Sequence, residues 1–262
     1  MVGASYAQKI AVKKGQQLET IATTKMSMEV MGQNMDNLST LTSSVAVKDI
    51  TDSSYIFSNT VKRMTIKING MGQDISFDSD KKEDMDGQMG QALKDQIGAI
   101  QEIQVSKQGK VISTRQTADK KPGPDMASMM SMSGDLTQGQ PYPILIQLPA
   151  KAVKVGDTWT DSSSSAATIK TVTTYTLKSV GAEGALVSFT GTMVKNGTIQ
   201  QNGMEIQMDI TGTVKGDAAY EVGSGLLKTN TSTSDIKGTL GIMGQNAPIA
   251  ATITATVVAK KI

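Results

Sequence analysis

The stretch Pro149-Ala-Lys-Ala-Val-Lys-Val-Gly-Asp-Thr-Trp159 lies just past the midpoint of the 262-residue chain and contains its single tryptophan. Part of it has an earlier counterpart, because the segment 152–159 (AVKVGDTW) aligns with the segment 11–18 (AVKKGQQL). Glycine readily adopts the positive φ that turns require, so a shared glycine at this point indicates a shared turn. We interpret the two segments as equivalent turns, each of which opens one copy of a repeated unit.

Further matches in the same order support a duplication. The tripeptide Asn69-Gly70-Met71 returns as Asn202-Gly203-Met204, and Gly109 corresponds to Gly225. The second copy is shorter by about the length of one helical segment. We predict a signal-peptide remnant over residues 1–7 and a first β repeat over 8–117, with an inserted helix at about 83–100. A linker with a short Met-rich helix follows over 118–148, and a second β repeat over 149–262. The two repeats are expected to form one domain.

Alternation with a period of two predicts long strands that have one solvated face. From Leu18 to Val30 the even-numbered residues are mostly apolar or small, whereas most odd-numbered residues are polar. The same alternation returns from Met204 to Val214. Asn69-Gly70 favours a type I′ hairpin turn. These patterns predict a mainly β fold in which two related antiparallel meanders form one curved sheet or open half-barrel, with one or two short Met-rich helices on its concave face.

One segment changes to a helical period. Apolar residues recur there at intervals of three and four, which makes one apolar helical face, at Met85, Met89, Leu93, Ile97 and Ile100. Asp80 and Glu83 have the spacing of a capping box at the start of this helix. The acidic residues around them do not have the spacing of a calcium-binding loop, because Lys81 and Lys82 interrupt it. A helix N-terminus that attracts acidic side chains explains the cluster better.

The composition argues against several classes of function. The chain has no cysteine, which excludes disulfides and thiolate zinc sites, and no histidine, the commonest general base. We therefore predict a protein that is not an enzyme and has no cofactor. The net charge of +2 is scattered rather than gathered in a basic patch, so no nucleic-acid partner is predicted. No apolar run approaches the roughly 20 residues of a transmembrane helix.

The first residues resemble the end of a secretory signal. Ser5 and Ala7 fit the small-x-small cleavage pattern, which would make Gln8 the first mature residue. We expect an exported protein that is periplasmic or associated with the outer membrane. A chance match at an N-terminus without fixed structure is the alternative.

A second short helix is predicted after Asp125, where four methionines lie within seven residues, namely Met126, Met129, Met130 and Met132. Thioether sulfur is a soft ligand, so one hypothesis for this cluster is Cu(I) binding. The simplest alternative is that methionine fills irregular apolar space in the core. A third interpretation is an adaptable surface for an apolar ligand or partner.

The motif around Trp159 resembles a known family. The segment Leu148–Trp159, together with Gly109-Lys110-Val111 and Gly225-Leu226-Leu227, is similar to exported bacterial envelope proteins of unknown function. Members pair a Lys-x-Gly start with a Val-Gly-Asp-[Ser/Thr]-Trp start in the second half. Many look like lipoproteins, whereas this chain has no cysteine for a lipid anchor. The resemblance implies no catalytic residue, and by analogy the fold is similar to half-barrel carriers of lipoproteins and lipids.

Our leading hypothesis is an envelope protein that binds a lipid, another apolar small molecule or a lipidated partner between its sheet and its Met-rich helices. Trp159 is interpreted as a core anchor or, alternatively, as part of the ligand cavity. The predicted ligand-binding residues are Met26, Met28, Met85, Met89, Leu93, Met126, Met129, Met130 and Trp159. The second hypothesis is a structural or interaction module of the envelope that has a filled core, no ligand and an envelope protein as its partner, and Cu(I) binding is the third.

Overall fold

A computed structural model describes residues 10–30, 32–70, 72–116, 136, 138–149, 151–165, 169–201, 204–242 and 245–262. The predicted signal remnant and the predicted helix at Met126, Met129 and Met130 lie outside these residues. The described strands are β1 Gln17–Val30, β2 Gln33–Ile50, β3 Ser54–Gly70, β4 Gln73–Asp78, β5 Ile100–Ser106, β6 Val111–Gln116, β7 Thr158–Ser165, β8 Ile169–Gly181, β9 Gly184–Gln201, β10 Met204–Tyr220, β11 Leu227–Ile242 and β12 Gln245–Lys261. The described helices are α1 Lys82–Asp86 and α2 Gln88–Leu93.

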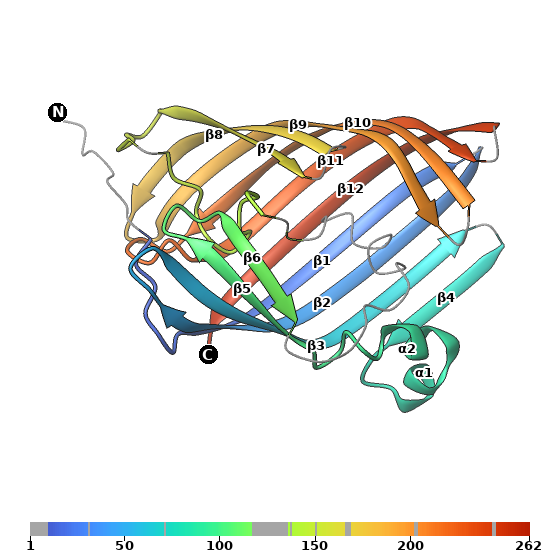
Figure 1. Cartoon of the computed structure of the whole chain (residues 1–262), viewed down its shortest axis with the longest axis horizontal. Coiled ribbons are helices and arrows are strands. Elements are labelled where there is room, and N and C mark those ends of the chain that lie inside the picture. The colour runs from blue at the N-terminus through green and yellow to red at the C-terminus, as the bar shows by residue number, and fades with distance from the viewer. Residues whose placement is uncertain are drawn as a thin grey trace.

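All twelve strands form one antiparallel sheet that is not closed, which confirms the predicted fold class. The strand order is β6-β5-β3-β2-β1-β12-β11-β10-β9-β8-β7, and β4 pairs with β3 outside this path. Figure 1 shows the sheet curved into an open half-barrel, with β7 and β8 along one rim and β4, β5 and β6 along the other. The first and last strands, β1 and β12, pair at its centre and join the two meanders into one sheet.

The concave face carries the apolar side chains. On β1, Leu18 and Met26 are buried on this face, whereas Lys25 and Glu29 are exposed on the other. The predicted alternation along this strand is therefore confirmed. It follows from pleat geometry, because successive side chains point to opposite faces of a sheet. The convex face is mostly polar, so the interior of the half-barrel is where apolar residues are withdrawn from water.

The two segments that were aligned in the sequence form the same turn. The Gly15 N–H donates to the Val47 carbonyl oxygen at 2.9 Å, and the Gly156 N–H donates to the Leu177 carbonyl oxygen at 2.8 Å. Both glycines have positive φ, at 84° and 96°. Each turn leads into a strand whose hairpin partner supplies the accepting carbonyl, β2 for β1 and β8 for β7. The two turns thus have the same backbone hydrogen bond and the same type of glycine conformation.

The inserted helices interrupt one strand of the first copy. In the second copy, β9 pairs with the single long strand β10. In the first copy, β3 pairs with β4 through Thr65–Gly70 and with β5 through Ser54–Thr60. Helices α1 and α2 lie between β4 and β5 in the chain. The pair β4 and β5 therefore takes the place of β10, which explains why the first copy is longer.

The inserted helix is shorter than predicted. Instead of one helix over 83–100, α1 and α2 are separated at Gly87, which has an extended backbone with ψ of 175°. The predicted capping box is also wrong, because the N-cap residue is Lys81 and no side chain caps the first turn. Asp80 binds Arg63 instead, with Nε and Oδ2 3.2 Å apart. Among the described residues, no helix is long and apolar enough to cross a membrane.

The first hairpin turn after β3 lies two residues later than predicted. Gly70 pairs with Gln73, so Asn69 and Gly70 belong to β3 rather than to the turn. Gly70 is needed for a different reason, because a Cβ atom there would lie 2.4 Å from the Asn34 carbonyl oxygen. Both glycines have positive φ, at 140° for Gly70 and 74° for Gly72. The sequence signal identified the hairpin correctly, but both of its residues lie within β3.

Apolar side chains fill the two ends of the half-barrel. The larger cluster packs the segment around Leu145 and Ile146 against Phe57, Ile103 and Leu177 on the sheet. A second cluster, near the opposite ends of the strands, contains Met26, Met208, Ile210, Ile236 and Ile253. The middle of the concave face lies between these two clusters, and the candidate site is found there.

Candidate functional site

A cavity of about 500 Å³ lies on the concave face between the two apolar clusters. On β1 it is bordered by Ala22 and Thr24, which fall between buried Leu18 and buried Met26 on the same face. Both halves of the chain contribute to its wall, from β2 and β3 across the central strands to β8 and β9. Its volume falls within the range of about 300–1,000 Å³ that is typical of small-molecule sites.

Small side chains on the central strands create this space. Ala22 on β1, Gly212 on β10 and Ala255 on β12 all line the cavity. Larger residues lie next to them on the same face; for example, Ile253 lies two positions before Ala255 on β12. A strand position with a small side chain leaves unfilled the depth that a leucine or isoleucine would occupy. The sequence therefore makes a gap in the apolar layer rather than a continuous core.

The wall combines apolar and hydroxyl groups. Its apolar part comes from large aliphatic and thioether side chains, at Leu41, Met64, Ile66, Leu93, Met193, Val214, Ile236 and Ile253. Its hydroxyl groups come from Thr24, Ser39, Thr40, Thr171, Thr173, Thr192, Thr213, Ser232 and Ser234. None of the described lining residues carries a charge. Such a wall suits a largely apolar ligand that makes a few polar contacts.

Three asparagines place buried acceptors next to this wall. The side-chain carbonyl oxygens of Asn37, Asn59 and Asn230 are buried and have no hydrogen-bond partner among the described residues. Each asparagine lies two positions from a lining residue on the same strand and face, namely Ser39, Val61 and Ser232. A buried acceptor without a donor costs about 1–3 kcal/mol, so water or a bound hydroxyl would be favoured at these oxygens.

The described members of the predicted ligand-binding set belong to three different apolar clusters. Met26 belongs to the second cluster and Met28 packs against it, whereas Met85, Met89 and Leu93 lie at α1 and α2. Among these residues Leu93 also lines the cavity. Met126, Met129 and Met130 lie outside the described residues.

The space beneath the helices is filled. Met85 and Met89 pack against Ile66, Phe77 and Leu93, each of which is only 2% exposed. This close packing leaves the cavity beside α2 rather than under it. A filled layer here is what the interaction-module hypothesis requires for this part of the molecule.

Trp159 packs at the border of the larger cluster, where its indole stacks on Tyr175. It is not among the described lining residues of the cavity. Asp157 stabilises the preceding turn by accepting a 2.8 Å hydrogen bond from the Lys154 N–H. Burial raises the pKa of Tyr175 to about 12, so this phenol stays protonated at neutral pH. These contacts favour the interpretation of Trp159 as a core anchor.

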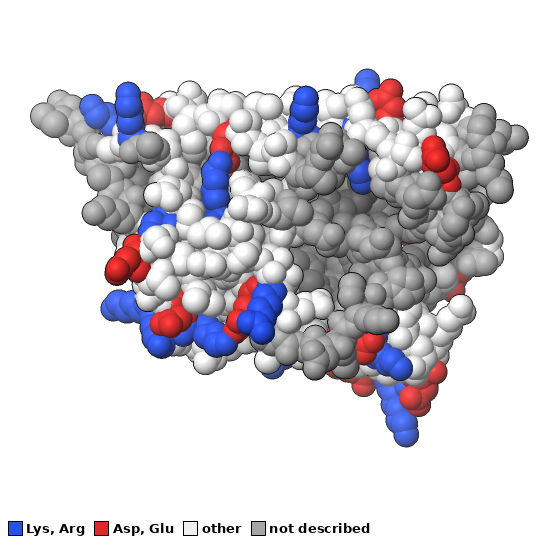
Figure 2. All heavy atoms as spheres, viewed as in Figure 1, with Lys and Arg blue, Asp and Glu red and all other residues white. Residues whose placement is uncertain are grey.

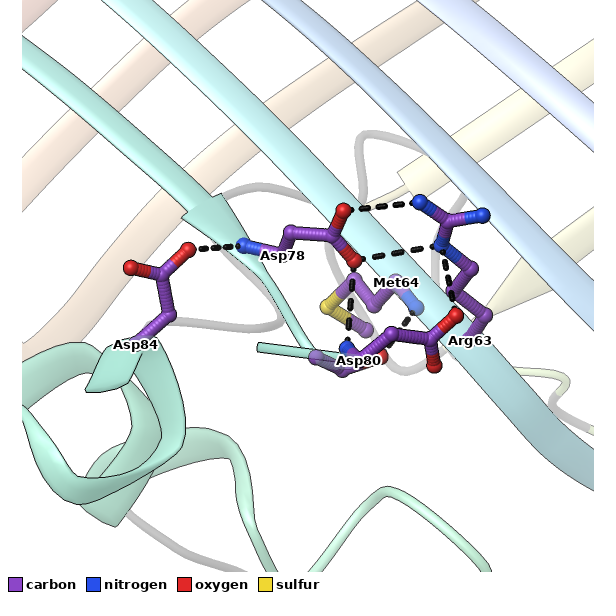
Figure 3. Close-up of polar contacts among 6 residues, drawn as sticks. Arg63, Met64, Asp78, Asp80 and Asp84 are labelled. Atoms are coloured by element: carbon purple, nitrogen blue, oxygen red, sulfur yellow. Dashed lines mark hydrogen bonds and ion pairs between the residues drawn. The ribbon is translucent and has the colours of Figure 1, made fainter. Parts of the chain in front are cut away.

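Two acidic residues near α1, Asp78 and Asp80, bind to one arginine (Figure 3). The Arg63 guanidinium donates to both carboxylate oxygens of Asp78, at 3.1 and 2.7 Å, and lies 3.2 Å from Asp80. This pairing holds the pKa of Asp78 below its usual value. Asp84 accepts a 2.7 Å hydrogen bond from the Asp78 N–H, which ties α1 to β4. Within the described residues, no group of three or more acidic, histidine or cysteine side chains could hold a metal ion.

Charged groups are placed away from the centre of the site. On the face shown in Figure 2, the described charged side chains gather in the left half and along the margins. An inward-facing carboxylate, Asp161 on β7, is paired with Lys110 at 2.6 Å. The described lining of the cavity is thus uncharged.

Sequence reasoning missed the cavity because its wall has no motif. The available signal was the run of small residues at inward positions of β1, β10 and β12, where alternation would otherwise place large apolar residues. The strand order was also needed, since β1 and β12 lie at opposite ends of the printed sequence but side by side in the sheet.

Comparison with solved structures shows the same type of sheet in a larger protein. A structure described as "lipid-protein interactions in lipovitellin" matches with a TM-score of 0.55 and 10% sequence identity over 95% of this chain. The chain spans a quarter of the length of that lipovitellin chain. A second match is the COG4313 outer membrane channel from Pseudomonas putida F1, with a TM-score of 0.29 and 7% identity. The alignment includes 98% of this chain and 100% of the channel chain.

Sequence comparison gives a family without an activity. No curated protein matches this chain. The model described as "Family of unknown function (DUF6263)" matches residues 52–121 and 125–227. Since these segments make up more than half of the chain, the protein belongs to this family.

Proposed function

We propose that this protein is a non-enzymatic carrier or receptor that holds an apolar ligand, such as a lipid or the acyl chain of a lipidated partner, in the concave cavity. The observation that carries the proposal is the uncharged cavity of about 500 Å³ between two packed apolar clusters. An apolar ligand would bury apolar surface of the wall, and this burial would contribute about 25 cal/mol of binding free energy per Å². The hydroxyl groups would orient the ligand.

The likeness to lipovitellin supports this proposal through its fold. The lipovitellin structure is described by its lipid–protein interactions, and the matching region covers nearly all of this chain. The absence of histidine and cysteine from the complete printed sequence supports a role without catalysis. We further propose that the protein acts in the bacterial envelope after export, on the basis of the small-x-small pattern at Ser5 and Ala7.

A binding experiment with two matched variants tests the site. Ala255 lines the cavity on β12, whereas Ala250 on the same strand is exposed on the convex face. Ala255→Phe should fill the cavity and weaken binding of a fluorescent fatty acid at least tenfold. Ala250→Phe adds the same ring outside and should bind like the wild type. Native mass spectrometry of protein purified from membranes should detect bound lipid in the wild type and less in Ala255→Phe.

Two results would overturn the proposal. One is wild-type protein that carries no lipid and binds no fatty-acid probe. The other is equal binding by Ala255→Phe and Ala250→Phe when circular dichroism shows that both are folded, because the ligand would then sit elsewhere.

A second candidate function is an interaction module of the envelope. It is favoured by the packed cluster of Met85, Met89 and Leu93 beneath the helices, which leaves no space for a ligand there. In that case, the wild type would bind no lipid and would co-purify reproducibly with one envelope protein.

A further inference from the structure

Strand β9 carries a lysine on the concave side of the sheet. Lys195 pairs across the sheet with Ile210, which is buried on the concave face. Its neighbours in sequence, Val194 and Asn196, are exposed, whereas Lys195 is half-buried. Side chains on a strand alternate between faces, so Lys195 lies on the same side as Met193. Met193 lines the cavity and Lys195 is not among its described lining residues, so the Lys195 side chain starts about 7 Å beyond this part of the wall, two residues at about 3.3 Å each.

This placement is unusual within the described part of the sheet. On neighbouring strands, Lys170, Lys215 and Lys237 are exposed at convex positions. Asp161 faces inward but is already paired with Lys110. No acidic side chain in the described part of the chain forms an ion pair with Lys195.

An ammonium group at an apolar wall has a defined chemical preference. Partial burial weakens its hydration, and an anion in contact with it restores the lost interaction. The cavity wall beside it has no charge of its own among the described residues, so it cannot supply that anion. A ligand with an apolar chain and one anionic end would cover the apolar wall with its chain and pair its charge with the Lys195 ammonium. A neutral chain would leave the lysine without a partner.

We propose that Lys195 binds the anionic headgroup of a single-chain lipid, such as the carboxylate of a fatty acid, whose chain occupies the cavity. This inference rests on the proposed function and adds the class of ligand to it. The long side chain of lysine can keep its aliphatic part against Ile210 while its amine reaches the headgroup at the cavity border. The cation thereby sets a preference for charged over neutral lipids and fixes which end of the ligand lies near β9.

A pair of ligands that differ only in charge tests this preference. The purified chain is loaded with N-phenyl-1-naphthylamine, a neutral fluorescent probe of apolar sites, and the probe is displaced with oleate or with oleyl alcohol. The wild type should bind oleate about tenfold more tightly than the alcohol, the effect of one charge-assisted contact. Lys195→Met should abolish this difference by weakening oleate and leaving the alcohol unchanged. Lys195→Arg should keep it, and Lys237→Met, which removes an exposed convex lysine, should behave as the wild type.

The outcomes separate the two proposals. If neither ligand displaces the probe from the wild type, the proposed lipid-binding function fails and this inference fails with it. If both ligands bind but Lys195→Met retains the oleate preference, the cavity binds lipid and the role of Lys195 is wrong. If the wild type binds both equally, the anionic class is wrong although the cavity is correctly assigned. Added salt should reduce the wild-type preference, because ions screen a charge at the cavity border.

Discussion

The Trp159 indole stacks on the Tyr175 ring, with the ring centroids 5.6 Å apart and an angle of 18° between the planes. The two residues lie opposite each other in the β7–β8 register, so the stack holds the edge strand β7 to its neighbour. Strand β7 has a hydrogen-bonded neighbour on one side only, namely β8. Side-chain contacts between β7 and β8 therefore contribute more to the order of β7 than such contacts do for a strand in the middle of the sheet.

Trp159→Ala should lower the free energy of unfolding by about 2–3 kcal/mol, somewhat less than full burial would give, because the ring is only partly buried. Trp159→Phe should cost much less. It keeps the apolar contact and removes an indole N–H that has no partner among the described residues. Urea unfolding followed by circular dichroism measures both, since neither variant keeps tryptophan fluorescence. Equal losses for the two variants would contradict a role in stacking.

Gly156→Ala should destabilise the protein by about 1–2 kcal/mol through backbone strain alone. The residue has φ of 96°, and a Cβ atom there would meet no atom within 4 Å. Gly15→Ala should give a similar loss, because its φ is 84° and its surroundings are equally open.

Gly181→Ala is the matched control for these two variants, because Gly181 also has open space but lacks a positive φ. It should be neutral or slightly stabilising. Thermal unfolding of the three variants is the measurement. A loss at Gly156 without one at Gly15 would argue against equivalent turns in the two copies.

Asp78→Asn should lower the melting temperature at neutral pH, with the difference closing as the pH falls below about 4. The Arg63 guanidinium lowers the pKa of Asp78, so the folded state favours the ionised carboxylate. Its contribution is therefore present above the unfolded pKa and is lost as the pH falls through the folded pKa.

Asp36→Asn provides the control, since Asp36 is exposed on β2 and forms no ion pair with a described residue. Its melting temperature should follow the wild type at both pH values. A difference for Asp78→Asn that persisted unchanged in acid would mean that Arg63 does not stabilise the fold through this charge.

Local patterns in the sequence predicted the strands well. The alternation from Leu18 to Val30 has the period of a pleated strand, and the glycines at 15 and 156 marked turns that recur in the structure. The helix prediction was wrong in length. The apolar residues keep a helical period on both sides of Gly87, but the backbone is extended at this glycine and divides the helix into α1 and α2. The capping box was wrong because Arg63, distant in sequence, binds Asp80.

The candidate site depended on information that no single segment contains. Its wall comes from strands of both copies, and the small residues Ala22, Gly212 and Ala255 have meaning only when their strands are neighbours. The methionines of the predicted helices pointed elsewhere: Met85 and Met89 pack in a core, and Met126, Met129 and Met130 lie outside the described residues. A search for inward positions occupied by small residues, combined with the β1–β12 pairing, would have located the cavity.

The pairing of β1 with β12 also sets the order in which the protein can mature. Each meander consists mostly of hairpins between neighbouring strands, which form locally and quickly, whereas β1–β12 is a contact of very high sequence separation. Ala22 and Ala255 face the same cavity from these two strands. During synthesis, the first meander therefore keeps an unpaired edge at β1 until β12 has been made. The cavity wall is complete only after this last pairing, because it needs side chains from both strands.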